Sequence, residues 1–228
     1  MMSYVSVLEE VKNLADDEYR KFCTTFVSTR QQMFGVRLPS LRKIAKRIAK
    51  QEPLSFITEE KQNIYEMILL EGMVLSYMDK PLAEILPFCE SFLDKVDNWA
   101  QIDSTFCNFK SVRNEAAMAL DVVRTWLKSD KEFTVRAGLV ILLAHYVRQE
   151  NLDMIFGLSQ KVNHKGHYVH MANAWLISVC MAKFPEETII FFQENSLDNK
   201  THNKAILKSR ESLRVSKEHK LIIHELKR

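Results

Sequence analysis

The residues best suited to chemistry lie between Val96 and Asp103, where a tryptophan precedes a carboxylate by four positions. On a helix, Trp99 and Asp103 share one face. A large aromatic ring beside a carboxylate suits a cationic or electron-poor sugar centre, because the ring packs on that centre and the carboxylate supplies opposing charge. The alternative is a core tryptophan and an aspartate that caps a neighbouring helix, and spacing alone favours this alternative.

Arg136 and Trp175 are two further residues that could belong to a site. Arg136 lies in an otherwise apolar stretch from Val135 to Ile141, and Trp175 lies within Ala172–Leu176. An arginine on such an inward-facing surface needs an anion, either a protein carboxylate or a phosphate.

Three histidines, His164, His167 and His170, are spaced by three positions. Three imidazoles can bind zinc, but this group spans Gly166 and has no fourth Cys or carboxylate ligand close in sequence. A helix start that faces solvent or DNA is the favoured alternative, so we expect no metal site. Glycine-rich nucleotide-binding motifs, H-E-x-x-H and G-x-S-x-G are also absent, and we expect no cofactor.

The cysteines and the N-terminus bear on the compartment. No Cys-x-x-Cys pair occurs among Cys23, Cys89, Cys107 and Cys180, so buried free thiols are expected. The segment Met1–Val5 lacks the charged and apolar regions of a signal peptide, and no apolar run reaches the roughly 18 residues of a membrane helix. We therefore expect a cytoplasmic protein with no membrane partner.

Charge is distributed unevenly along this chain of net charge +3. Tyr19–Gln51 holds nine Lys or Arg and no Asp or Glu, and Asn199–Arg228 holds nine basic and three acidic residues. The remainder of the chain therefore carries a net charge of −12. Concentrated positive charge on an otherwise acidic protein indicates a polyanion such as nucleic acid, and the alternative is a solvated basic helix face.

Helical periodicity dominates the elements that must position these residues. Leu41, Ile44, Ala45 and Ile48 form an apolar stripe, with Pro39 in the first turn. Further helices are predicted at 64–77, 82–93, 114–127, 133–147, 168–183 and 201–214. About a dozen helices, generally of roughly 10 to 20 residues, predict an all-α, HEAT-like solenoid of stacked antiparallel helix pairs, with an irregular bundle as the alternative. No long linker divides the chain, so residues 1–228 are expected to form a single domain.

Several segments together resemble AlkD-type DNA alkylation repair proteins. Phe34–Arg42 is similar to their FG(I/V)-x-x-P-x-x-R motif, and the stretch from Asn98 to Asp103 resembles their Trp-plus-Asp helix. Arg136 falls at the family's phosphate-binding arginine and Trp175 at its second site tryptophan. The basic segment Asn203–Ser212 resembles the family's last repeat. The resemblance runs in order from about Phe34 to the C-terminus.

The resemblance implies a HEAT-like fold that holds duplex DNA in a concave basic groove and releases positively charged alkylated purines, such as 3-methyladenine and 7-methylguanine, without base flipping. It implies that Asp103 stabilises the sugar cation and positions water, that Trp99 and Trp175 pack on the deoxyribose, and that Arg136 holds the adjacent phosphate. The implied contacts to the DNA backbone come from Arg37, Arg42, Lys43, Lys46, Arg47, Lys204 and Lys208. A monomer is expected.

The sequence departs from the family at two places. Typical members have a Trp-Asp-x-x-Asp signature, whereas Ala100 and Gln101 follow Trp99 here. The family's approach to Phe34 is of a Lys-x-x-Phe type, whereas this chain has Phe26–Met33. These departures motivate a second hypothesis, a related helical-repeat module that binds DNA or protein without excision. A plain scaffold with solvated basic faces is the third.

Overall fold

Residues 3–228 are described by the computed structural model, and their regular structure is helical. In this part of the chain no β-strand is present, and an isolated parallel bridge joins Gln32 to Ile64. The all-α prediction is therefore confirmed. The chain divides into two compact units, Met1–Ala119 and Leu120–Arg228, which are described separately. That the whole chain forms a single domain remains a prediction.

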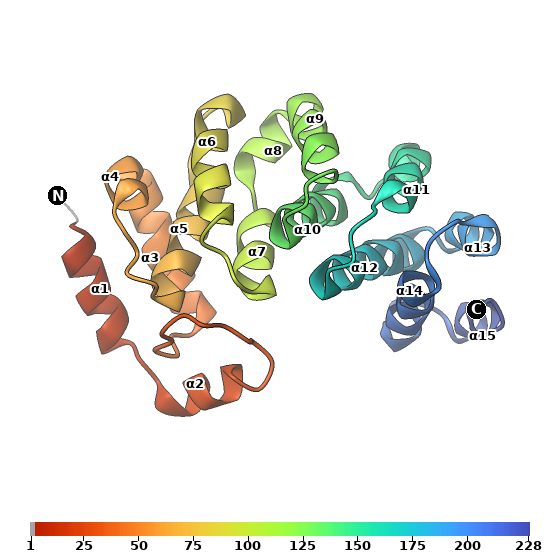
Figure 1. Ribbon diagram of the computed structural model, residues 1–228, viewed down its shortest axis with the longest axis horizontal. Helices are drawn as coiled ribbons and strands as arrows, with labels where there is room; N and C mark the ends of the chain where they lie inside the picture. Colours follow the sequence, from red (N-terminus) through yellow and green to blue (C-terminus); the bar gives the residue numbers. More distant parts are fainter. Residues whose placement is uncertain (1–2) are drawn as a thin grey trace. The chain divides into compact units, whose positions relative to one another are not determined.

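Unit 1 is built around one buried helix. Its helices are α1 (Tyr4–Asn13), α2 (Asp17–Cys23), α3 (Leu38–Lys50), α4 (Pro53–Thr58), α5 (Tyr65–Tyr77), α6 (Leu82–Leu93), α7 (Trp99–Phe106) and α8 (Lys110–Asn114). Helix α5 packs between α3 and α7 and also contacts α4, α6 and α8 (Figure 1). It is buried on all sides because its sequence is apolar around the whole helix, apart from two glutamates. Helix α2 and the loop after it lie at one edge of the unit (Figure 1).

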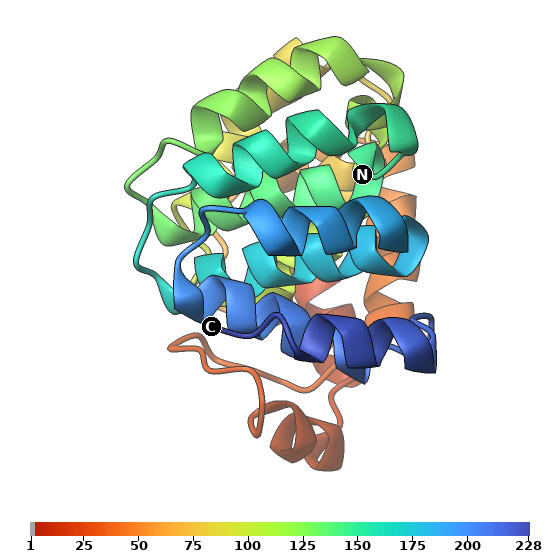
Figure 2. The ribbon, with the colours of Figure 1, turned by 90° about the vertical axis from the view of Figure 1, so that its right-hand side faces the viewer.

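Unit 2 repeats this pattern around α12. Its helices are α9 (Ala116–Trp126, which begins in unit 1), α10 (Glu132–Ile141), α11 (Leu152–Lys161), α12 (His167–Lys183), α13 (Pro185–Glu194), α14 (Asn199–Glu211) and α15 (Lys217–His224). Helix α12 packs between α10 and α14. Helices α11, α13 and α15 lie side by side (Figure 2), and the rings of Phe156 and Phe191 stack between α11 and α13 with centroids 4.2 Å apart.

A buried charge cluster fastens α4 to α5. The ammonium of Lys61 donates to the carbonyls of Phe56 at 2.7 Å and Ile57 at 3.1 Å, which belong to the last turn of α4. The carboxylate of Glu71 lies 3.6 Å from Lys61 and accepts from Lys95 at 2.6 Å. Burial lowers the pKa of Lys61 to about 8, against the opposing effect of Glu71. The cluster satisfies helix-end carbonyls that would otherwise be buried without partners.

The predicted helices agree closely with the structure. Helix α3 buries the four residues of the predicted stripe and has proline in its first turn, and the six other predicted ranges each overlap an observed helix. The range 133–147 divides into α10 and a π-helical turn, Leu142–Tyr146. Helices of only five to eight residues, such as α4 and α8, are more numerous than periodicity indicated, because one turn is too short to show a repeat.

The thiols have the predicted state. None of the four cysteines is in a disulfide; Cys23, Cys89 and Cys180 are buried and Cys107 is half-buried. Burial raises the pKa of Cys89. These thiols are therefore part of the packing.

Candidate functional site

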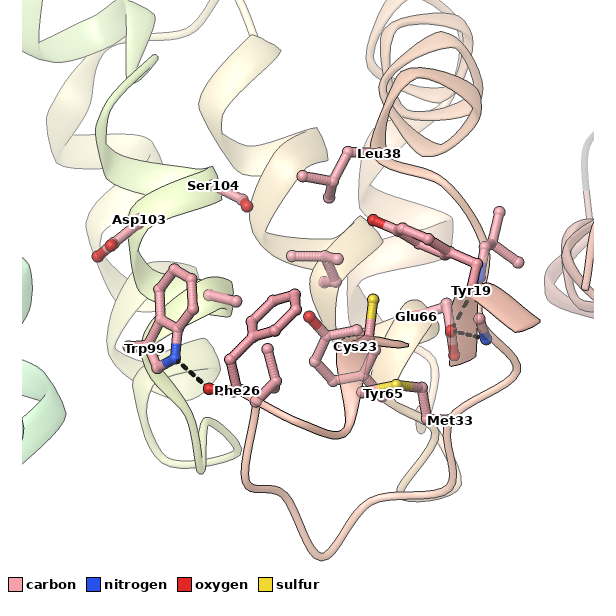
Figure 3. A pocket seen from close by; sticks show the side chains of 15 residues that line it. Tyr19, Cys23, Phe26, Met33, Leu38, Tyr65, Glu66, Trp99, Asp103 and Ser104 are labelled. Carbon is pink, nitrogen blue, oxygen red and sulfur yellow. Dashed lines mark hydrogen bonds between the residues drawn. The ribbon is translucent and has the colours of Figure 1, made fainter. Parts of the chain in front are cut away.

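Helix α7 places Trp99 and Asp103 on the same side of unit 1. The side chain of Asn98 caps the helix, accepting from the amides of Ala100 at 3.1 Å and Gln101 at 3.2 Å. An asparagine cap fixes where a helix begins, and hence the direction of its first side chains. Trp99 and Asp103 follow one turn apart, as predicted, and both border the same cavity (Figure 3).

Trp99 is half-buried and is tied to the N-terminal loop. Its indole N–H donates to the carbonyl of Phe26 at 3.1 Å, and the two ring centroids are 6.5 Å apart. A tryptophan with its polar edge satisfied and its ring partly accessible can pack on a ligand without losing its orientation. The ring is therefore partly accessible, whereas the alternative interpretation of the sequence places Trp99 in a core.

The cavity beside α7 has a volume of about 100 Å³. Figure 3 shows the hydroxyl-bearing rings of Tyr19 and Tyr65 across it from Trp99. Burial raises the pKa of both tyrosines; the neighbouring Glu66 adds to the effect at Tyr65, and a hydrogen bond with Cys23 adds to it at Tyr19. Both hydroxyls therefore stay protonated at neutral pH and can donate hydrogen bonds.

The Phe34–Gly35–Val36 turn closes one side of this cavity through Glu66. The fully buried carboxylate accepts from the backbone amides of Phe34 at 3.0 Å, Gly35 at 2.7 Å and Val36 at 3.3 Å. Gly35 has a φ of +85°, and a Cβ there would lie 2.4 Å from the carbonyl of Asp16. The FG motif is therefore a backbone turn wrapped around a buried anion, and only glycine fits its centre.

A second set of hydrogen bonds holds the loop before that turn. The carboxylate of Asp97 accepts from the hydroxyl of Thr29 at 2.7 Å and the amide of Arg30 at 2.8 Å. Buried Gln101 donates to the side chain of Gln31 at 2.6 Å. Gln101, in the segment that departs from the family signature, thus has a structural partner in this chain.

Arg136 is almost fully buried in α10 of unit 2, with 5% of its surface exposed. Its guanidinium donates to the carbonyl of Tyr168 at 2.9 Å. The same turn of α12 is fixed by Glu132, whose carboxylate accepts from the amide of Tyr168 at 2.6 Å. A backbone carbonyl therefore supplies one acceptor where the sequence predicted an anion.

Trp175 borders a wider depression in unit 2. The depression has a volume of about 330 Å³ and is lined on its other side by Lys208, Glu211 and Arg214. Trp175 itself is half-buried. Its surroundings are thus more basic than those of Trp99 and more open to a charged partner.

The predicted DNA-binding residues of α3 lie on its exposed side. Arg37 pairs with Asp16 at 2.9 Å and stacks over the ring of Tyr19. Arg47 pairs with Glu10. The other exposed cations of this group are Arg42, Lys43 and Lys46. On α14 of unit 2, Lys204 and Lys208 are half-exposed.

The three histidines have protein partners. His164 contacts the carbonyl of Asp130 at 3.0 Å, His167 packs its ring against that of Tyr168 with centroids 5.3 Å apart, and His170 contacts the hydroxyl of Thr201 at 2.6 Å. Among residues 3–228, no cluster of three His, Cys, Asp or Glu has the geometry of a metal site.

Periodicity did not reveal the residues that complete the cavity, namely Tyr19, Phe26, Tyr65 and Glu66. One signal was present, because Glu66 is an acid inside an apolar helical run. A charge in such a run needs a partner, but the partner lies about thirty positions away in the backbone of the FG turn.

These features define an all-helical protein with an aromatic–carboxylate pair in unit 1 and a basic, tryptophan-lined depression in unit 2. The chain belongs to the DNA alkylation repair enzyme family, whose model matches residues 7–215. The resemblance found from the motifs is thereby confirmed. Membership indicates repair of alkylation damage and an interaction with DNA. No curated protein matches the sequence. Within residues 3–228, no helix combines the length and the apolarity needed to cross a membrane.

Proposed function

We propose that this protein is a DNA glycosylase that releases positively charged alkylated purines, such as 3-methyladenine and 7-methylguanine, from duplex DNA. One observation carries the proposal: in a member of the alkylation repair family, half-buried Trp99 and Asp103 lie on one face of α7 beside a cavity. An aromatic face next to a carboxylate matches the charge of a reacting sugar.

The chemistry follows from the charge of the lesion. When the C1′–N bond breaks, its electron pair neutralises the cationic base, so no strong general acid is needed. The remaining sugar has oxocarbenium character, as in other glycosidic cleavages. Asp103 stabilises this cation and positions the water that adds to C1′, and the proton of that water leaves to solvent.

The other site residues position the damaged nucleotide. Trp99 and Trp175 pack on deoxyribose, and Arg136 holds the adjacent phosphate. Sequence-independent contacts to the DNA backbone come from Arg37, Arg42, Lys43, Lys46, Arg47, Lys204 and Lys208. The exposure of the α3 cations and the basic lining beside Trp175 support these roles.

The small size of the cavity beside α7 supports excision without enclosure of a flipped base at that cavity. Its volume of about 100 Å³ is well below the roughly 300–1,000 Å³ of pockets that enclose small molecules. A flipped purine needs such a pocket, whereas a base that stays stacked does not. The protein then needs to contact only the sugar and the phosphate of the damaged nucleotide.

The architecture that we propose for this task is a HEAT-like solenoid with a concave basic face, acting as a monomer in the cytoplasm. Repeated packing supports the solenoid, since α5 lies between two helices of unit 1 and α12 between two helices of unit 2. Successive helix pairs that contact their neighbours are the pattern of such repeats.

A second candidate function is DNA binding without excision. It is favoured by the departure from the family signature at Ala100 and Gln101, the second of which holds Gln31 of the N-terminal loop. Under this hypothesis the basic surfaces bind duplex DNA, and Asp103 makes no difference to the fate of the base.

The test is release of free base from duplex DNA that carries 7-methylguanine. The wild-type protein should produce free 7-methylguanine and an abasic strand, and Asp103→Asn should lose this activity. Asp121→Asn is the control, because Asp121 is an exposed carboxylate paired with Arg124 on α9. Salt-dependent binding without release would establish the second function instead. Equal release by wild type and Asp103→Asn would remove Asp103 from the mechanism.

A further inference from the structure

A row of aromatic rings runs from α2 to Trp99 across unit 1. The centroids of Tyr19 and Phe22 are 6.3 Å apart, those of Phe22 and Phe26 are 5.0 Å apart, and those of Phe26 and Trp99 are 6.5 Å apart. Each spacing is within the range of favourable ring contacts. The row is therefore continuous with the aromatic–carboxylate pair of the candidate site.

The middle of the row is exposed. Phe22 has 60% and Phe26 46% of its surface accessible. Single exposed apolar residues are ordinary on protein surfaces, but two adjacent phenylalanines that continue into a candidate site form an apolar patch. Such a patch is typical of a surface that is covered by a ligand.

The patch is held in place by the loop after α2. Asp97 anchors Thr29 and Arg30, and Glu66 anchors the FG turn. The hydroxyl of Thr25 donates to the carbonyl of Phe22 at 2.7 Å, which fixes the end of α2. Aromatic rings on an anchored backbone lose little conformational freedom when they stack on a ligand.

Charge indicates what covers the patch. From Tyr19 to Arg37 the chain has four basic residues and no acid, and Lys21 and Arg30 are exposed. Of the acids around the start of α2, Asp16 pairs with Arg37 and Asp17 with Arg20, and Glu18 is exposed. Exposed aromatic rings among cations are typical of surfaces that stack on nucleobases, whereas an apolar protein partner would not require the cations.

We propose that Phe22 and Phe26 form a stacking wedge for nucleobases exposed at weakened steps in DNA. The inference rests on the proposed function only in taking DNA as the partner. A damaged or unpaired base costs less to unstack than a paired one, and apolar wedges at such steps are used by other DNA-binding proteins. The wedge therefore selects DNA with a weakened step and holds that step beside Trp99, and this stacking does not require the alkylated base itself to leave the helix.

Binding to two duplexes of one sequence tests the wedge. One duplex is intact, and the other carries a tetrahydrofuran abasic analogue opposite 2-aminopurine. The wild-type protein should bind the second duplex more tightly and change the fluorescence of 2-aminopurine. Phe22→Ala should lower its affinity for that duplex by about tenfold, leave affinity for the intact duplex within about twofold, and abolish the fluorescence change.

Two further variants and a control distinguish stacking on a nucleobase from a contact made by any large apolar side chain. Phe22→Trp should retain the preference, and Phe22→Leu should lose it, because leucine is apolar but has no flat face. Ile190→Ala is the control, since Ile190 is 54% exposed on α13 of unit 2. Circular dichroism should be unchanged in all four variants.

Three results would overturn the wedge. They are equal affinity of Phe22→Ala and wild type for the abasic duplex, an equal loss for both duplexes, and Phe22-dependent binding to phosphatidylserine vesicles in place of DNA. Excision is read separately, from base release at saturating protein. Absence of 7-methylguanine release would refute the proposed glycosylase and leave the wedge standing, because the wedge is measured by binding.

Discussion

Trp99 in unit 1 and Trp175 in unit 2 have different surroundings, although both are half-buried on helices. Trp99 begins a capped helix, donates its N–H to the carbonyl of Phe26 and borders a cavity of about 100 Å³. Trp175 lies in the middle of α12 and borders a depression of about 330 Å³ with Lys208 and Arg214 on its rim.

The two sets of surroundings suit two different tasks, namely excision of a base and binding of the DNA backbone. The surroundings of Trp99 are preorganised by a cap and an anchored loop, which suits a step where an aromatic ring and a carboxylate must be held in position. The surroundings of Trp175 are basic and open, which suits the phosphate backbone. We therefore expect changes at Trp99 to affect stability and excision, and changes at Trp175 to affect mainly affinity.

The largest effect is expected at the buried anion of unit 1. Glu66→Gln replaces an acceptor of three backbone amides by a neutral side chain, and we expect the free energy of unfolding to fall by about 3 kcal/mol. Urea denaturation measures this loss. Glu84→Gln, at an exposed pair with Lys80 on α6, should change it by less than about 0.5 kcal/mol. Equal stability of the two variants would show that the anion does not hold the FG turn.

A matched pair of glycines contrasts the two units. Gly35→Ala should lower the free energy of unfolding by about 2 kcal/mol, because of the positive φ and the contact with Asp16. Gly157→Ala, in α11 of unit 2, should raise it by about 0.5–1 kcal/mol, because no atom lies within 4 Å of the added Cβ. Thermal melting of both variants tests the sign of each change, and two changes of the same sign would contradict the structure.

Replacement of Trp99 and replacement of Trp175 should affect different properties of the protein. Trp99→Ala should lower both the melting temperature and the rate of base release, because the indole holds Phe26. Trp175→Ala should lower affinity for duplex DNA by about tenfold and leave the melting temperature nearly unchanged. Melting and binding are measured on the same preparations. If Trp175→Ala instead destabilises the protein more than Trp99→Ala, the assignment of tasks is reversed.

The smallest effects are expected at single basic faces. The double change Arg42→Gln and Lys43→Gln on α3 should reduce the slope of log affinity against log salt concentration by about 2, and Lys204→Gln with Lys208→Gln should do the same. Arg124→Gln, paired with Asp121 on α9, is the control. If both double variants have the same slope as wild type, these basic residues face solvent and do not contact DNA.

The helices could be predicted from sequence because their signals are local. The stripe from Leu41 to Ile48 and the proline in the first turn of α3 define that helix within one segment. The motifs of the family, from Phe34 to the last basic helix, also indicated the class of protein correctly. Short helices such as α8 were missed because five residues contain too little repetition.

The environment of the site could not be predicted in the same way. The bonds of Glu66 to the FG turn and of Asp97 to Thr29 join positions about thirty and about seventy apart. Periodicity carries no information on such pairs, and only the folded backbone brings them together. The sequence therefore indicated Trp99 and Asp103 but not the cavity that they border.

The central claim is that the Asp103 carboxylate stabilises the sugar cation during base release. The most direct measurement is the single-turnover rate constant for release of 7-methylguanine from duplex DNA at saturating protein, for wild type and Asp103→Asn. We predict a decrease of about 100-fold or more in the variant, with duplex affinity within about threefold of wild type. Equal rate constants for the two proteins would contradict the claim.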